Sequence, residues 1–213
     1  MENRRTIKPG VYLVADPAVD EAVLMKKLES ALEEEIAALQ IWDHFLPGQN
    51  TAELIEQICK PAHKKNVPVL INNEWKYLKN TSLDGVHFDQ PPENLAAIHK
   101  LINRPFITGL TCNNDLSTVH WANNNNFDYI SFCSIFPSAT DTSCELVNFE
   151  TIRETKKITS MPVFLAGGIK PENIKKLKGL HFEGVAVISG VMGSATPSEA
   201  VKAYSEQLKA NKI

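Results

Sequence analysis

The sequence predicts a (β/α)8 barrel that occupies the whole chain, residues 1–213, as one domain. Eight short apolar runs alternate with stretches that repeat apolar residues at helical spacing, which is typical of parallel strands joined by helices. The strand runs are apolar throughout, as expected for strands that are covered on both faces. No low-complexity linker divides the chain. A doubly wound open sheet is the alternative arrangement.

The elements are expected in strict alternation along the chain. The expected strands are residues 11–15, 36–42, 68–72, 85–88, 106–110, 128–132, 162–166 and 184–188. The expected helices are residues 21–34, 51–64, 75–80, 94–102, 116–124, 149–158, 172–178 and 197–209. Pro91 and Pro92 open the fourth helix, where proline is favoured. The asparagine run 123–126 should end the fifth helix, because asparagine tolerates the left-handed conformation.

Composition narrows the class of protein. Hydrophobic residues make up 43% of the 213 residues, charged residues 22%, and the net charge is -3, which is ordinary for a globular protein and unlike a nucleic-acid footprint. No apolar run is long enough to span a membrane, and no signal peptide is recognised at the amino end, so we expect a cytoplasmic protein. The four cysteines show no CxxC spacing and are expected to be free thiols.

The candidate site follows from the predicted fold, because the active site of such a barrel lies at the carboxyl ends of its strands. That rule collects Gln40, Trp42, Asp43, His44, Asn72, Asn73, Glu74, His87, Asp89, Gln90, Thr111, Cys112, Asn113, Gly167, Gly168, Ser189 and Gly190. The loop after residue 132 is rich in hydroxyls, which suits a phosphate, although many such loops are plain surface turns. The Gly-Gly and Ser-Gly turns after the last two strands suit a second phosphate, or form a packing pair.

Six stretches identify a family when they are taken in order. VYLVADP, LINN, GVHFDQ, DYISFCSIFPSAT, PVFLAGGIKPENI and GVAVISGVMGS resemble the thiamine phosphate synthase / TenI superfamily, over nearly the whole chain. The resemblance implies a (β/α)8 barrel. It also implies a transferase of thiamine biosynthesis that joins hydroxymethylpyrimidine diphosphate to a thiazole phosphate and releases diphosphate, with Mg2+ bound to the leaving group. The TenI branch instead tautomerises a thiazole carboxylate phosphate.

The resemblance also implies roles for particular residues. Gln40, with Thr111, would position the pyrimidine, and Asn72 would lie beside the diphosphate. Ser138 and Thr140 match the hydroxyls of the family's phosphate loop. The thiazole phosphate would be bound by Gly167, Gly168, Ile188, Ser189 and Gly190. Gln90 matches the glutamine of another family motif, which follows the fourth strand. The implied partners are small phosphorylated thiamine precursors, with a homodimer as a further possibility.

Several positions depart from the family pattern. Where the synthases carry arginine, lysine, two metal-binding aspartates and a second lysine, this chain has Trp42, His44, Asn73, Pro92 and Asp141. A Mg2+ site would therefore have to be shifted, because Mg2+ needs only one or two carboxylates besides phosphate oxygens. The candidate ligands for a shifted site are Glu74, Asp89, Glu93 and Asp141.

The alternatives to a synthase remain open from sequence. The position of the TenI catalytic histidine holds Asn113, which leaves His44 and His87 as possible acid–base groups of an isomerase. A barrel that binds phosphorylated ligands without catalysis is another reading. Cys112, Cys133 and Cys144 with a histidine would make a zinc site, whereas free cysteines that act as small hydrophobes are commoner.

Overall fold

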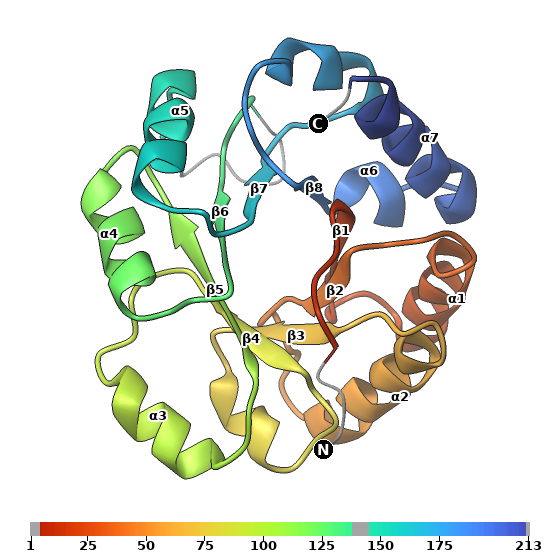
Figure 1. Cartoon of the computed structure of the whole chain (residues 1–213). Coiled ribbons are helices and arrows are strands. Elements are labelled where there is room, and N and C mark those ends of the chain that lie inside the picture. The colour runs from red at the N-terminus through yellow and green to blue at the C-terminus, as the bar shows by residue number, and fades with distance from the viewer. Residues whose placement is uncertain (1–4, 138–144, 212–213) are drawn as a thin grey trace.

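The computed structural model describes residues 5–137 and 145–211, and these form a closed barrel of parallel strands (Figure 1). The strands pair in chain order and β8 returns to β1, which confirms the predicted barrel over the doubly wound sheet. The strands are β1 (Gly10–Ala15), β2 (Ala38–Ile41), β3 (Val69–Asn72), β4 (Gly85–Phe88), β5 (Ile107–Cys112), β6 (Tyr129–Phe132), β7 (Val163–Ala166) and β8 (Gly184–Val187).

Helical segments cover the outside of the barrel (Figure 1). They are α1 (Glu21–Ala31), α2 (Thr51–Lys64), η1 (Trp75–Lys79), α3 (Leu95–Ile102), α4 (Leu116–Asn124), α5 (Phe149–Ile158), η2 (Pro171–Leu177), α6 (Ser189–Met192) and α7 (Pro197–Ala210). Two of the expected helices, η1 and η2, are 3-10 helices. In η2 the buried residues Ile174 and Leu177 are three apart, which a 3-10 turn places on one face. No described helix is long and apolar enough to cross a membrane.

Short polar residues set the helix boundaries. The side chains that accept a backbone N–H of the first turn belong to Asp20, Asn50, Asn94, Asp115 and Asn148. Asparagine and aspartate are favoured at this position because their oxygens satisfy amides that have no partner within the helix. The asparagine run 123–126 ends α4 as predicted, since Asn125 caps the helix and Asn126 is left-handed with φ 54°.

The strands separate two apolar cores. Along β1, Val11 and Leu13 point outward and belong to the large core between strands and helices. Tyr12 and Val14 point inward and belong to a smaller core inside the barrel. This alternation follows from the period of two along a strand. The inward positions are therefore the ones that can carry a site.

Acidic residues tie adjacent strands together at the amino end of the barrel. Asp84, Asp128 and Glu183 each precede a strand, and each accepts the backbone N–H at or near the start of the strand before it. Each carboxylate thereby satisfies an amide at the barrel's lower rim. This arrangement repeats at β4, β6 and β8.

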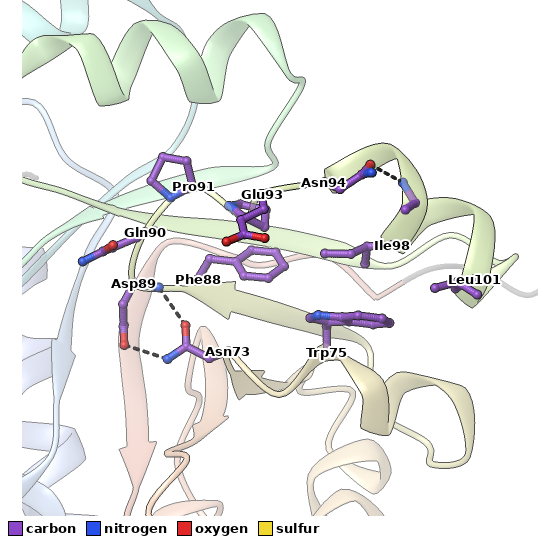
Figure 2. A pocket seen from close by; sticks show the side chains of 12 residues that line it. Asn73, Trp75, Phe88, Asp89, Gln90, Pro91, Glu93, Asn94, Ile98 and Leu101 are labelled. Carbon is purple, nitrogen blue, oxygen red and sulfur yellow. Dashed lines mark hydrogen bonds between the residues drawn. The ribbon is translucent and has the colours of Figure 1, made fainter.

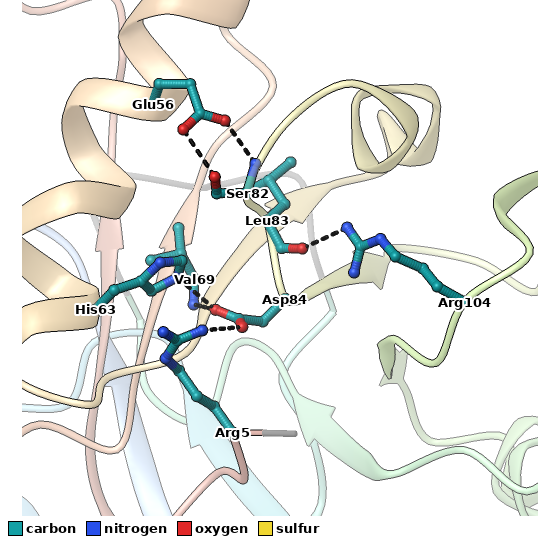
Figure 3. A network of polar contacts seen from close by, with 8 residues as sticks. All are labelled: Arg5, Glu56, His63, Val69, Ser82, Leu83, Asp84 and Arg104. Carbon is teal, nitrogen blue, oxygen red and sulfur yellow. Dashed lines mark hydrogen bonds and ion pairs between the residues drawn. The ribbon is translucent and has the colours of Figure 1, made fainter. Parts of the chain in front are cut away.

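Asp84 is the centre of the largest of these networks (Figure 3). Its carboxylate accepts from Arg5 Nη1 at 2.9 Å and from Val69 N at 2.8 Å, and it lies 2.8 Å from His63 Nε2. Burial alone would raise the pKa of Asp84, but the hydrogen bonds from His63, Val69 and Arg5 outweigh it and lower the pKa. The amino end is therefore stabilised by a carboxylate that is paired with the Arg5 guanidinium and bonded to the Val69 amide.

Candidate functional site at the barrel mouth

Polar side chains gather inside the barrel at the carboxyl ends of β2 to β6. Gln40 and Asn72 are buried, and Thr111 is half-buried. Gln40 Nε2 donates to Asn72 Oδ1 at 2.6 Å, and Gln40 Oε1 accepts from the Tyr12 hydroxyl at 2.7 Å. The structure thus brings together Gln40 and Asn72 directly, as the sequence predicted for this edge of the barrel.

Two carboxylates meet at the same amide groups. Asn73 Nδ2 lies 2.8 Å from Asp43 Oδ2 and 2.8 Å from Asp89 Oδ2. Asn72 Nδ2 donates to the same oxygens, at 2.9 Å for Asp89 and 3.4 Å for Asp43. Asn73 is left-handed with φ 51°, and its Oδ1 accepts from Asp89 N at 3.0 Å, which fixes the orientation of its amide (Figure 2). The partners of both carboxylates here are neutral amides.

This carboxylate pair is the arrangement at the mouth that suits a divalent cation. Asp89 is one of the metal ligands predicted from sequence, and Asp43 is not. The signal for Asp43 was its place two residues after β2, at the same barrel edge as Asp89. Glu74 and Glu93 are exposed, and Asp141 lies outside the described residues. Mg2+ is commonly bound through one or two carboxylates and phosphate oxygens, so Asp43 and Asp89 fit it.

His87 lies in the barrel interior between Tyr129 and Thr111. Its Nδ1 is 2.8 Å from the Tyr129 hydroxyl and its Nε2 is 2.8 Å from Thr111 Oγ1. Burial lowers the pKa of His87 to about 4, against the opposing effect of the Asp89 charge, so the imidazole is neutral near pH 7. His44, the other histidine considered from sequence, is exposed and stacks on Trp42 with ring centroids 3.7 Å apart.

Tyr12 and Tyr129 join the polar network of the candidate site, and sequence reasoning missed them. Their hydroxyls are 2.8 Å apart and their ring centroids 5.8 Å apart. The Phe164 ring centroid lies 5.5 Å from that of Tyr12 and 5.7 Å from that of Tyr129. Gly109 leaves room for Tyr129, since a Cβ there would lie 2.1 Å from the Tyr129 ring. Through these two phenols the Gln40–Asn72 pair is linked to His87 and Thr111.

The glycine turn after β7 has a packing role. Gly167 and Gly168 have φ of 89° and 63°. A Cβ at Gly167 would lie 2.4 Å from Ser134 N, and one at Gly168 would lie 2.6 Å from the Phe136 carbonyl oxygen. Glycine is needed for the turn and for the close approach to the loop after β6. A phosphate site at this turn remains a prediction.

The remaining predicted residues lie after β8, after β4 and in the loop after β6. Ile188 caps the short helix α6 that begins at Ser189, and a Cβ at Gly190 would lie 2.1 Å from the Tyr204 hydroxyl. Gln90 is exposed on the loop after β4. Ser138 and Thr140 lie outside the described residues, so the hydroxyl loop is not placed.

The cysteines that the structure describes are free thiols. Cys112 is buried, and burial raises the pKa of its thiol to about 12, which suits a small hydrophobe better than a metal ligand. Within residues 5–137 and 145–211, no three His, Cys, Asp or Glu side chains form a metal-binding group. Cys144 lies outside those ranges.

A groove opens beside the carboxylate pair (Figure 2). Its volume is about 670 Å³, and Asn73 and Asp89 belong to its wall. Trp75, Phe88 and Ile98 supply apolar surface, and Glu93 adds a carboxylate at the rim. The groove therefore reaches Asp89 and Asn73 from outside the barrel interior, and Asp43 is not among its lining residues.

Comparison with known proteins gives the family. A family model described as thiamine monophosphate synthase matches residues 11–191. A thiamine-phosphate synthase of Nitrosococcus oceani is 30% identical over 201 residues, which cover 92% of this chain and 91% of that protein. One of Clostridium tetani is 28% identical over 199 residues, 93% of each chain.

The fold agrees with a solved structure. Thiamine phosphate pyrophosphorylase from Pyrococcus furiosus superposes with a TM-score of 0.82 at 20% identity, and the match covers 98% of this chain and 99% of that one. Orotidine 5'-monophosphate decarboxylase from Methanocaldococcus jannaschii shares the barrel at a TM-score of 0.69 and 20% identity, over 94% of this chain and 99% of that one. At these identities the likeness concerns the fold. With the family match over residues 11–191, the chain belongs to the thiamine monophosphate synthase family.

Proposed function

We propose that this protein joins a hydroxymethylpyrimidine diphosphate to a thiazole phosphate. In that reaction the bond between the pyrimidine methylene carbon and the diphosphate oxygen breaks, and a bond to the thiazole nitrogen forms. Membership of the family supports the reaction class. The observation that carries the proposal here is the bonded set Gln40, Asn72 and Asp89 at the carboxyl ends of adjacent strands. Amides would hold the pyrimidine and diphosphate, and carboxylates would hold the cation.

Asp43 and Asp89 would hold Mg2+ at this mouth. When bound, Mg2+ neutralises charge on the departing diphosphate. The chain's own part is to keep two carboxylates together. Asn72 and Asn73 do so by donating to both, and the donated hydrogen bonds offset part of the repulsion between the two charges.

The thiazole phosphate would bind at the β7–β8 side of the mouth. Gly167 and Gly168, with Ile188, Ser189 and Gly190, match the family's thiazole-phosphate pocket. Their positions at the ends of neighbouring strands support this assignment. Ser138 and Thr140 would complete the phosphate contacts from the loop after β6.

Turnover is expected to be slower than in a family member with the usual cations. Trp42 and His44 stand where the family pattern has arginine and lysine, and they stack on one another. Removal of one electrostatic contact to a transition state typically costs about 100- to 1000-fold in rate. Losses within one cluster do not add simply.

The direct test is turnover of the purified protein with both substrates and Mg2+, measured as diphosphate release. We expect slow, Mg2+-dependent release that Asp89→Asn reduces at least tenfold. Glu74→Gln, which removes an equal charge at an exposed position near the mouth, should leave the rate unchanged. No diphosphate release while both substrates bind in calorimetry would contradict the reaction and favour a barrel that only binds.

A further inference from the structure

A continuous run of side-chain hydrogen bonds crosses the barrel interior from the carboxylate pair to Thr111. We infer that the hydrogen bonds of this run all point from donor to acceptor in one direction, which the carboxylates impose. As a result, neutral His87 carries its proton on Nδ1, and Thr111 is a hydrogen-bond acceptor toward the mouth. Tyr12, Tyr129 and His87 are then positioning residues for Gln40 and Thr111. The inference deepens the proposed function, and only its consequence for the ligand rests on that function.

The direction starts at Asp89. An ionised carboxylate can only accept hydrogen bonds. Asn72 must therefore turn its Nδ2 toward Asp89, at 2.9 Å, which leaves its Oδ1 facing Gln40. Asp43, at 3.4 Å from the same nitrogen, adds a second acceptor on that side.

The next link follows from the first. Because Asn72 offers an oxygen, Gln40 must donate its Nε2, at 2.6 Å. Its Oε1 then faces the Tyr12 hydroxyl at 2.7 Å, and Tyr12 must be the donor. Neither amide can be turned over without placing two donors or two acceptors together.

The two phenols pass the direction on, because each has a single hydrogen. Tyr12 gives its hydrogen to Gln40, so its oxygen accepts from Tyr129 at 2.8 Å. Tyr129 has then used its own hydrogen. Its oxygen must accept from His87 Nδ1, also at 2.8 Å, and the imidazole hydrogen therefore lies on Nδ1.

The run ends at Thr111. His87 is buried and its two ring nitrogens lie against the hydroxyls of Tyr129 and Thr111, so a second ring proton would place a positive charge in the interior beside neutral groups. With the proton on Nδ1, His87 Nε2 is therefore an acceptor, and the Thr111 hydroxyl at 2.8 Å donates to it. Ser131 Oγ lies 3.4 Å from both Thr111 Oγ1 and His87 Nε2, on the same side of the ring. Thr111 is half-buried and lies near the carboxyl end of β5, at the edge of the barrel that carries the candidate site.

This arrangement selects the chemistry of a ligand. A group seated against Thr111 must be a hydrogen-bond donor, such as the amino group of a heteroaromatic ring. A ring nitrogen with a lone pair would meet another lone pair. In the proposed reaction the pyrimidine would therefore direct an N–H at Thr111.

The test is the tautomer of His87, read by long-range proton–nitrogen NMR on protein labelled with 15N-histidine near pH 7. The chain has six histidines, and the His87 signals are those lost in His87→Gln. Should that variant not fold, sequential assignment identifies them. We expect a protonated Nδ1 and an unprotonated Nε2. A protonated Nε2, in a neutral ring or an imidazolium, would overturn the inference, whatever the enzyme assay shows.

Tyr12→Phe tests whether the direction is passed along the run. Without the Tyr12 oxygen, Tyr129 is free to donate to His87 Nδ1, and the tautomer should shift toward protonated Nε2. Tyr204→Phe is the matched control, because the Tyr204 hydroxyl is also buried but donates to Ile169 O outside the run. An unchanged tautomer in Tyr12→Phe would show that Tyr12 does not set it. Should Tyr12→Phe fail to fold, the wild-type tautomer decides alone.

Discussion

The two ends of the barrel hold their carboxylates in opposite ways. At the amino end, Asp84 is bonded by Arg5 and lies against His63, so its charge is balanced inside the protein. At the mouth, the Asp43 and Asp89 carboxylates accept from the amides of Asn72 and Asn73, which orient them without cancelling their charge. The first arrangement serves stability, and the second keeps negative charge available to a ligand. This matches the general division of such barrels, in which the carboxyl ends of the strands carry the chemistry.

The largest expected effect concerns the polar interior that leads to the mouth. The pKa of His87 falls from 6.5 to about 4 on folding, because the ring is buried. Between these two pH values, His87 binds a proton in the unfolded chain but not in the folded chain. Stability should therefore fall as pH drops from 6.5 to 4, by roughly 3 kcal/mol from this residue. Urea unfolding at several pH values should show this slope, and His87→Asn should flatten it. Equal slopes in both proteins would contradict a buried neutral His87.

The next effect sharpens the contrast at the amino end. Asp84→Asn keeps the shape but removes the charge that Arg5 and His63 face, and we expect a loss of about 2 kcal/mol in unfolding free energy near pH 7. Because folding lowers the pKa of Asp84, its contribution should persist above the carboxyl's unfolded pKa and disappear in stronger acid. The His87 and Asp84 effects thus occupy different pH ranges. A loss that does not diminish in acid would argue against the charge as its cause.

The smallest effect is expected for the corresponding aspartate-to-asparagine substitution at the mouth. Asp89→Asn retains an oxygen that accepts from Asn72 and Asn73, and it removes repulsion from Asp43. Without ligand, the unfolding free energy should stay the same or rise by up to about 1 kcal/mol, as expected where a site trades stability for function. A loss as large as that of Asp84→Asn would remove the distinction between the two ends.

Sequence reasoning reached the fold because strand and helix periods are local. It also placed Gln40, Asn72 and Asp89 at the mouth, because strand ends in a barrel share one rim. It missed Tyr12 and Tyr129, because a tyrosine in an apolar strand resembles any core residue until the register shows that both point inward and meet across the barrel. Part of that signal is in the sequence, because Tyr12 alternates with Val11 and Leu13 and must therefore point to the opposite face of β1.

Other residues required three-dimensional information. The Gly167–Gly168 turn was predicted as a phosphate site, and the structure adds that it packs against the loop after β6. Asp43 became a candidate ligand only when Asn73 was seen to join it to Asp89. The sequence resemblance alone does not indicate this pair, because it implies metal-binding aspartates at the positions of Asn73 and Pro92.

The most direct measurement is calorimetric titration of inorganic diphosphate into the protein, with and without Mg2+. The wild type and Glu74→Gln should bind diphosphate in a Mg2+-dependent manner, and Asp43→Asn combined with Asp89→Asn should weaken that binding at least tenfold. Circular dichroism of the double variant checks that the barrel is intact. Binding that survives in the double variant, or that does not depend on Mg2+, would contradict the assignment of the mouth carboxylates as the cation site.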